Sequence, residues 1–156
     1  MIQCLAEETK SGESVVRYIA LQEDKVVTGS DASLDVEPAF HLAIEGPSFE
    51  VVCDNMRDSV LPFLATRGAV FARMRPDMKQ RLVEILQDLD FVVIMCGDGA
   101  NDCGALKAAN AGISLSEAEA SVAAPFTSKT PDISCVPALI RSPFFLTPHC
   151  FSLFTQ

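Results

Sequence analysis

Short apolar runs alternate with amphipathic segments over most of the chain after residue 39, and this alternation predicts strands separated by helices. Before that point the pattern is broken, and one alternating run predicts a strand within an acidic region rich in loops. Strand, helix, strand is the order of parallel sheets flanked by helices, so we expect an α/β fold. The expected strands are residues 15–21, 42–44, 69–74 and 91–96, the last fully buried, and the expected helices are 47–55, 58–66, 76–89 and 103–110.

The clearest expected helix begins at Pro76, because proline is tolerated at the first helical position. Apolar residues then recur at the spacing of one helical face. Lys79 precedes Leu82 and Val83 by three and four positions, so it lies on or beside this inward face. An inward lysine needs an anionic partner, because an unpaired buried ammonium is costly. The alternative is that its aliphatic stem lies along the surface and the ammonium reaches water.

The loop after the last expected strand carries the strongest chemical signal, Gly97-Asp98-Gly99-Ala100-Asn101-Asp102. Ligands of parallel α/β sheets bind beyond the carboxyl ends of strands, and this loop lies at such an end. Two carboxylates with a neutral amide between them suit Mg²⁺, which is held by few protein oxygens and borrows others from a phosphate. A single aspartate here would be a helix cap or a turn former, but together with an inward Lys79 the loop favours a metal-phosphate site.

Composition narrows the class of protein. The 156 residues are 49% hydrophobic and 21% charged, which fits one soluble globular domain. A net charge of -9 opposes nonspecific nucleic-acid binding, so no nucleic-acid partner is expected. The six cysteines form no Cys-x-x-Cys pair, which favours reduced thiols over a zinc site, and Cys96 and Cys103 are expected to be packing residues. No apolar run approaches the roughly 20 residues of a membrane-spanning helix, so neither such a helix nor a signal peptide is expected.

Basic side chains gather in the middle of the chain and are opposed there only by Asp77. Two interpretations stay open: a small anion site, or long basic side chains that reach from a helix start into water. The basic residues are Arg67, Arg73, Arg75, Lys79 and Arg81.

Residues 71–83 and 95–107 together closely resemble the second half of the phosphorylation domain of P-type ATPases. Cys96 before the glycine, the run Asp-Cys-Gly-Ala-Leu-Lys at 102–107, and residues 112–128 resemble type V, subgroup B, whose members are endolysosomal cation and polyamine transporters. The resemblance spans about 69 to 141 and extends back to about 40. It implies a haloacid-dehalogenase-like (Rossmann-like) parallel sheet flanked by helices, incomplete in this chain.

The resemblance also implies roles for particular residues. Asp98 ligates Mg²⁺ and Asp102 completes or orients that metal site. Lys79 neutralises the phosphoryl group transferred from ATP, with help from Asn101, because phosphoryl transfer depends on positioning and charge neutralisation. The flanking glycines of the loop, Gly97 and Gly99, are the expected cofactor-binding positions. The implied cofactors are Mg²⁺ and ATP.

The chain also departs from the family. It contains no Asp-Lys-Thr-Gly-Thr motif, whose aspartate accepts the phosphoryl group, and the similar run at 24–29 lies too close to the metal loop to replace it. We therefore expect the chain alone to be inactive. Its expected partners are Mg²⁺, the phosphoryl group of ATP, and the nucleotide, actuator and transmembrane domains of an ATPase, none of which this chain contains. The expected location is the cytosolic face of an endomembrane.

Three segments are expected: an acidic flap over 1–38, a partial phosphorylation domain over 39–141, and an apolar tail over 142–156 that proline interrupts. The tail, which includes His149, suggests a truncated gene product. Two alternatives stay open. A noncatalytic binding module with the haloacid-dehalogenase fold fits the missing nucleophile, whereas a soluble phosphatase of that fold would need an Asp-x-Asp pair early in the chain, where none occurs.

Overall fold

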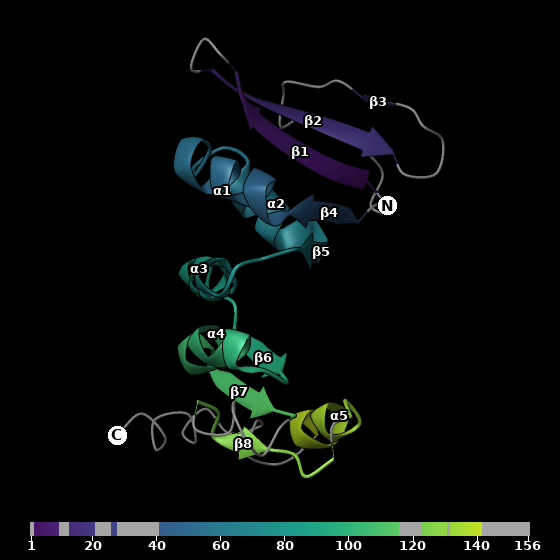
Figure 1. Cartoon of the computed structure of the whole chain (residues 1–156), viewed down its shortest axis with the longest axis vertical. Coiled ribbons are helices and arrows are strands. Elements are labelled where there is room, and N and C mark those ends of the chain that lie inside the picture. Colours follow the sequence, from purple (N-terminus) through teal and green to yellow (C-terminus); the bar gives the residue numbers. More distant parts are fainter. Residues whose placement is uncertain are drawn as a thin grey trace. The chain divides into compact units, whose positions relative to one another are not determined.

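A computed structural model describes residues 2–9, 13–20, 26–27, 41–115, 123–130 and 132–141. The chain divides into two compact units, Met1–Met78 and Lys79–Gln156, and each contains one sheet (Figure 1). The helix α3 (Pro76–Asp88) spans the division. Asp24 of the motif-like run and the tail 142–156 lie outside the described residues. The expected boundaries of the flap and the tail stay predictions.

The sheet of the first unit has the order β3-β2-β1-β4-β5. Its strands are β1 (Ile2–Glu8), β2 (Ser14–Ala20), β3 (Val26–Val27), β4 (Leu42–Glu45) and β5 (Gly68–Ala72). β2 pairs antiparallel with both β1 and β3, whereas β1 and β5 pair parallel with β4. The sequence pattern predicted β2, β4 and β5 but not β1. Cys4 of β1 and Tyr18 of β2 are both buried, so the strand that was not predicted contributes to the core as β2 does.

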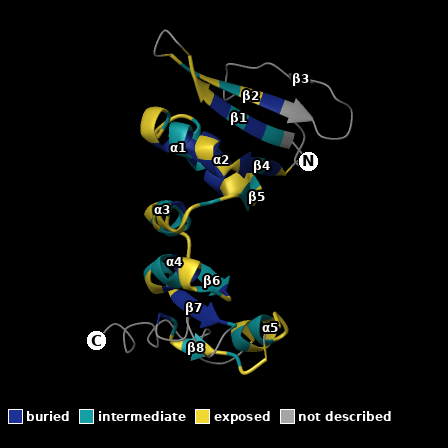
Figure 2. Cartoon of the chain, viewed as in Figure 1, coloured by how far each residue is buried: buried dark blue, intermediate teal, exposed yellow. Residues whose placement is uncertain are grey.

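Two helices, α1 (Gly46–Asn55) and α2 (Leu61–Arg67), follow β4, and each has a proline in its first turn. α1 packs on β1 and β4, and buried positions gather on these elements and on α2 (Figure 2). Phe49 of α1 is fully buried and meets the ring of Phe71 edge to face, with the ring centroids 5.9 Å apart. Aromatic packing of this kind, together with buried aliphatic side chains, stabilises the first unit.

The sheet of the second unit is wholly parallel, in the order β6-β7-β8. Its strands are β6 (Ile94–Gly97), β7 (Ala111–Ser114) and β8 (Phe126–Thr127), and its helices are η1 (Ala100–Asp102), α4 (Cys103–Ala108) and α5 (Cys135–Ile140). α4 packs on β6 and β7, and Leu106 and Ala123 form a buried cluster against which Met95, Cys103 and Ala124 pack. All four residues of β7 are buried.

The expectation that 91–96 is a fully buried strand is wrong. The strand begins at Ile94, its first three residues are only partly buried, and the preceding Phe91 and Val92 are 50% and 70% exposed. Phe91 and Val92 precede the strand, and β6 itself is an edge strand whose ladder runs only to β7 among the described strands. The side chains of a strand are buried all round only where other elements cover both faces of its sheet.

The expected fold class is confirmed: the protein is an α/β chain whose parallel strands are flanked by helices, as in an incomplete Rossmann-like domain. Within the described part of the chain, no helix combines the length and the apolar composition needed to cross a membrane.

Candidate functional site

The candidate loop lies where the sequence placed it, at the carboxyl end of a parallel strand. β6 ends at Gly97, and the chain then turns through η1 into α4. The carbonyl of Gly97 accepts a hydrogen bond from the amide of Leu115, just after β7, at 2.8 Å. The loop is therefore anchored at the edge where β6 and β7 both end, which is the ligand-binding edge of a parallel sheet.

Lys79 and Asp102 meet directly. The ammonium Nζ lies 2.7 Å from Asp102 Oδ1, and the two side chains are 34% and 10% exposed. Asp102 is therefore the anionic partner that an inward lysine requires, and it comes from the loop that the sequence singled out. A charge-assisted hydrogen bond this short, with one partner nearly buried, is stronger than an exposed ion pair.

Gly97 lets the carboxylate of Asp102 approach the backbone. A β-carbon at Gly97 would lie 2.6 Å from Asp102 Cβ and 2.7 Å from its Oδ2, well inside contact distance. At Gly99 an added β-carbon would meet no atom of the described residues within 4 Å. The two glycines of the loop thus differ: the first is required by packing, and the second leaves open space in front of the loop.

Asp98 and Asn101 are exposed and make no hydrogen bond or ion pair with another described residue. Among the residues that the structure describes, no group of three or more His, Cys, Asp or Glu side chains is arranged to hold a metal ion. Two neighbouring aspartates remain as donors. This set fits Mg²⁺, which commonly takes one or two carboxylates and completes its octahedron with water and phosphate oxygens.

The thiol at the end of β6 is suited to packing rather than to chemistry. Burial raises the pKa of Cys96, and the nearby Cys135, Asp98 and Asp102 raise it further. A thiol with a raised pKa is neutral at pH 7 and therefore a weak nucleophile.

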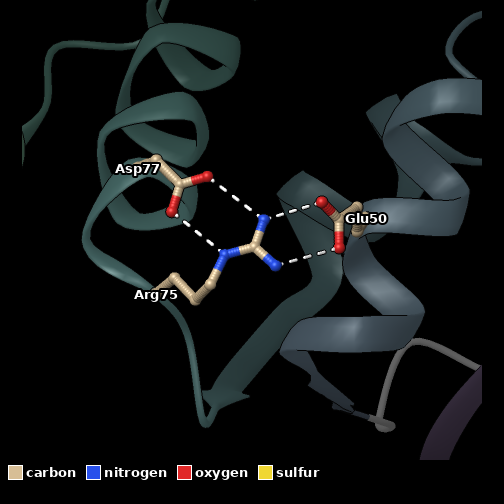
Figure 3. Close-up of polar contacts among 3 residues, drawn as sticks. All are labelled: Glu50, Arg75 and Asp77. Carbon is tan, nitrogen blue, oxygen red and sulfur yellow. Dashed lines mark hydrogen bonds and ion pairs between the residues drawn. The ribbon is translucent and has the colours of Figure 1, made fainter.

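The basic cluster does not form a shared anion site around Arg75. Its guanidinium binds both oxygens of Glu50, at 2.6 and 3.2 Å, and also binds Asp77 (Figure 3). The hydrogen bonds with Glu50 and then Asp77 raise the pKa of Arg75, and those with Arg75 lower the pKa of Asp77. Two carboxylates thus already neutralise Arg75, whereas Lys79 contacts the loop through Asp102.

One contact beside the site was not predicted from the sequence. A β-carbon on Gly104 of α4 would lie 2.7 Å from Gln80 Oε1, so this glycine lets the residue after Lys79 approach α4 closely. A glycine at the second position of an alanine-rich helix was the available signal, because glycine is unfavourable there without a packing reason.

Comparison with known proteins gives consistent matches. No protein-family model matches the chain. Over 102 residues, 65% of this chain, it is 65% identical to the mouse protein named polyamine-transporting ATPase 13A3. Over 139 residues, 88% of this chain, it is 52% identical to mouse probable cation-transporting ATPase 13A4, and over 114 residues, 73% of this chain, 58% identical to probable cation-transporting ATPase catp-6 of Caenorhabditis elegans. These matches cover 8%, 11% and 9% of the three relatives, so the chain spans about a tenth of their length.

Proposed function

Because this chain is homologous to a short segment of the type V, subgroup B P-type ATPases, we propose that it supplies the magnesium- and phosphoryl-binding half of their ATP-driven phosphorylation site. The observation that carries the proposal is the Lys79–Asp102 contact of 2.7 Å at the carboxyl end of β6, next to the exposed Asp98. One cation and two carboxylates at a strand end form the minimal set for a phosphoryl group and a divalent ion.

Each residue has a role in this proposal. Asp98 and Asp102 hold Mg²⁺, which neutralises charge on the phosphoryl oxygens when bound. Lys79 places its ammonium against the same group, and Asn101 donates a neutral hydrogen bond from the exposed side of the loop. The small glycines Gly97 and Gly99 leave room for the carboxylate and for the phosphate in front of the backbone. Positioning and electrostatic neutralisation of this kind account for most catalysis of phosphoryl transfer.

The nucleophile must come from outside this chain. No Asp-Lys-Thr-Gly-Thr run occurs in the sequence, and a lysine and two metal-bound carboxylates stabilise a phosphoryl group without attacking it. The proposed partners are therefore the nucleotide, actuator and transmembrane parts of a cation- or polyamine-transporting ATPase. The proposed substrate of the whole assembly follows the names of the relatives, and the proposed location is the cytosolic face of an endomembrane, endolysosomal in the whole transporter.

A labelling experiment tests the first half of this proposal. The chain is incubated with Mg²⁺ and γ-labelled ATP, and we expect no acid-stable label on the protein and no release of phosphate. The Asp24→Asn variant is the matched control. Label that appears on the chain and disappears in this variant would assign the nucleophile to the run at 24–29 and refute the proposal.

A chimera tests the second half. Residues 39–141 of this chain replace the matching segment of mouse ATPase 13A4, with which the chain is 52% identical over 139 residues. We expect the chimera to form the phosphoenzyme, and Lys79→Met or Asp98→Asn within the graft to abolish it. A chimera that reaches the membrane in normal amount but keeps its phosphoenzyme after both substitutions would show that these residues have no such role.

The alternative with a supporting observation is a noncatalytic binding module. The missing nucleophile favours it, and the chimera distinguishes it from the first proposal, because a module that has lost its catalytic geometry would not restore phosphorylation. A soluble phosphatase has less support, because the chain has no Asp-x-Asp pair in its early part.

A further inference from the structure

One carboxylate oxygen of Asp102 is already bonded, and the other lies against the backbone of Gly97. Oδ1 accepts the hydrogen bond from Lys79 Nζ at 2.7 Å. Oδ2 lies so close to Gly97 that a β-carbon there would be 2.7 Å away. The side chain is only 10% exposed, whereas Asp98 in the same loop is exposed to solvent. Asp98 is therefore exposed to an arriving cation, whereas Asp102 is nearly buried and held by Lys79.

A divalent cation and an ammonium group compete for the same carboxylate oxygen, because both bind its lone pairs and they repel each other. We propose, resting on the function proposed above, that Lys79 gates the metal site: its ammonium must leave Asp102 before that carboxylate can bind a divalent cation. The Lys79–Asp102 ion pair is then the closed state of the site rather than a permanent structural bond.

The side chain of Lys79 is able to move away from Asp102. Its side chain is 34% exposed, and lysine carries its charge on a flexible four-carbon stem that adopts several rotamers. A phosphoryl group in front of the loop gives the displaced ammonium a new anionic partner, so the charges exchange partners and none is left unpaired. Binding of the anion and binding of the cation therefore strengthen each other. By thermodynamic linkage, the factor by which the anion raises the affinity for the cation equals the factor by which the cation raises the affinity for the anion.

The gate is tested by titrating the full chain with Mg²⁺ alone and following the amide resonances of residues 97–102 by NMR. The test variant is Lys79→Met, which keeps the length of the side chain and removes its charge. The matched control is Lys107→Met, the same substitution at an exposed lysine of α4. We expect Mg²⁺ to bind about tenfold more tightly to Lys79→Met than to the unmodified chain, a typical size for such coupling. Lys107→Met should bind like the unmodified chain.

A second measurement avoids the variants, because Lys79→Met leaves a nearly buried carboxylate without its partner and can unfold the loop. In the unmodified chain, the ¹⁵N ammonium resonance of Lys79 should move as Mg²⁺ is added, and its protons should exchange faster with water. An ammonium resonance that stays in place while the loop amides saturate would overturn the gate.

The outcomes separate the gate from the function on which it rests. If Mg²⁺ shifts the loop amides and Asp98→Asn abolishes the shift, but Lys79→Met binds no more tightly, the metal site stands and the gate is refuted. Equal tightening in Lys79→Met and Lys107→Met would also refute it, because net charge alone would then explain the effect. If no variant responds to Mg²⁺, the metal site and the gate are both wrong.

Discussion

Adding one methyl group to the loop provides the sharpest test of its packing. In Gly97→Ala the new β-carbon would lie 2.6 Å from Asp102 Cβ, 2.8 Å from Cγ and 2.7 Å from Oδ2. Ordinary contacts begin at 3.4 Å, so the two groups must separate by about 0.6 to 0.8 Å. Because Cβ of Asp102 is itself in the clash, rotating its carboxylate is not enough, and the backbone at the start of α4 must shift.

We expect Gly97→Ala to lower the free energy of unfolding by about 2 kcal/mol, within the range of overpacking substitutions. With an m-value of about 2 kcal/mol/M, the urea midpoint falls by about 1 M. Gly99→Ala is the matched control in the same loop, because its added β-carbon meets no atom of the described part of the chain within 4 Å. The backbone of Gly99 is extended, with φ -132° and ψ 168°, so alanine there should stabilise the chain by about 0.4 to 1 kcal/mol through the unfolded state.

The assay is urea unfolding followed by circular dichroism, with a double-variant cycle. In an Asp102→Gly background the clash partner is gone, so Gly97→Ala should cost much less than it does alone. Equal midpoints for Gly97→Ala and Gly99→Ala, or an undiminished cost in the Asp102→Gly background, would refute the claim that this glycine is required by the aspartate.

Three further predictions concern the rest of the molecule. Phe49→Ala should lower the free energy of unfolding by about 3 to 5 kcal/mol in chemical denaturation, because Phe49 is fully buried. Phe91→Ala should lower it by less than about 0.5 kcal/mol, because Phe91 is half exposed. Equal effects would contradict the assigned core. Arg75 lowers the pKa of Asp77, so ionised Asp77 stabilises the fold above its ordinary pKa and this stabilisation is lost as the pH falls through the lowered value. Arg75→Ala should therefore raise that pKa towards the ordinary value in a carboxyl ¹³C titration, and an unchanged titration would oppose the contact in Figure 3. The edge strand β6 and the exposed Val92 beside it, 70% exposed, predict self-association of the chain. Val92→Lys should reduce this association in sedimentation velocity, since edge lysines oppose strand pairing between chains. Unchanged association would exclude this edge as the contact.

Much of the local structure follows from periodicity. Pro76 and the apolar spacing after it predicted α3, and the observed helix begins at that residue. The run at 42–44 predicted β4. β1 was missed, because its acidic and polar side chains break the alternation that marks a strand. Its residues are held in the sheet by pairing with β2 and β4, and such partners are chosen by tertiary contacts that no local window contains.

The segment before the loop shows a second feature that the local sequence does not determine, namely burial. Phe91 to Cys96 is uniformly apolar, and such a run is typical of a strand buried on both faces. In the structure Phe91 and Val92 are exposed and lie outside β6, which begins only at Ile94. Composition indicates how well a segment tolerates burial, whereas the elements that cover the two faces of the sheet decide whether burial occurs.

By itself the sequence determined the class of fold, the family resemblance and the loop that carries the candidate site, because each depends on residue type and spacing along the chain. It also required an anionic partner for Lys79, since an inward ammonium is unstable alone. Only the tertiary structure decided which anion that is. Asp102 lies 23 residues further along the chain, and it reaches Lys79 because Gly97 admits its carboxylate against the backbone. The same contact closes Asp102 to a metal ion until Lys79 moves, and this property of the proposed site exists only once α3 and the loop after β6 have folded together.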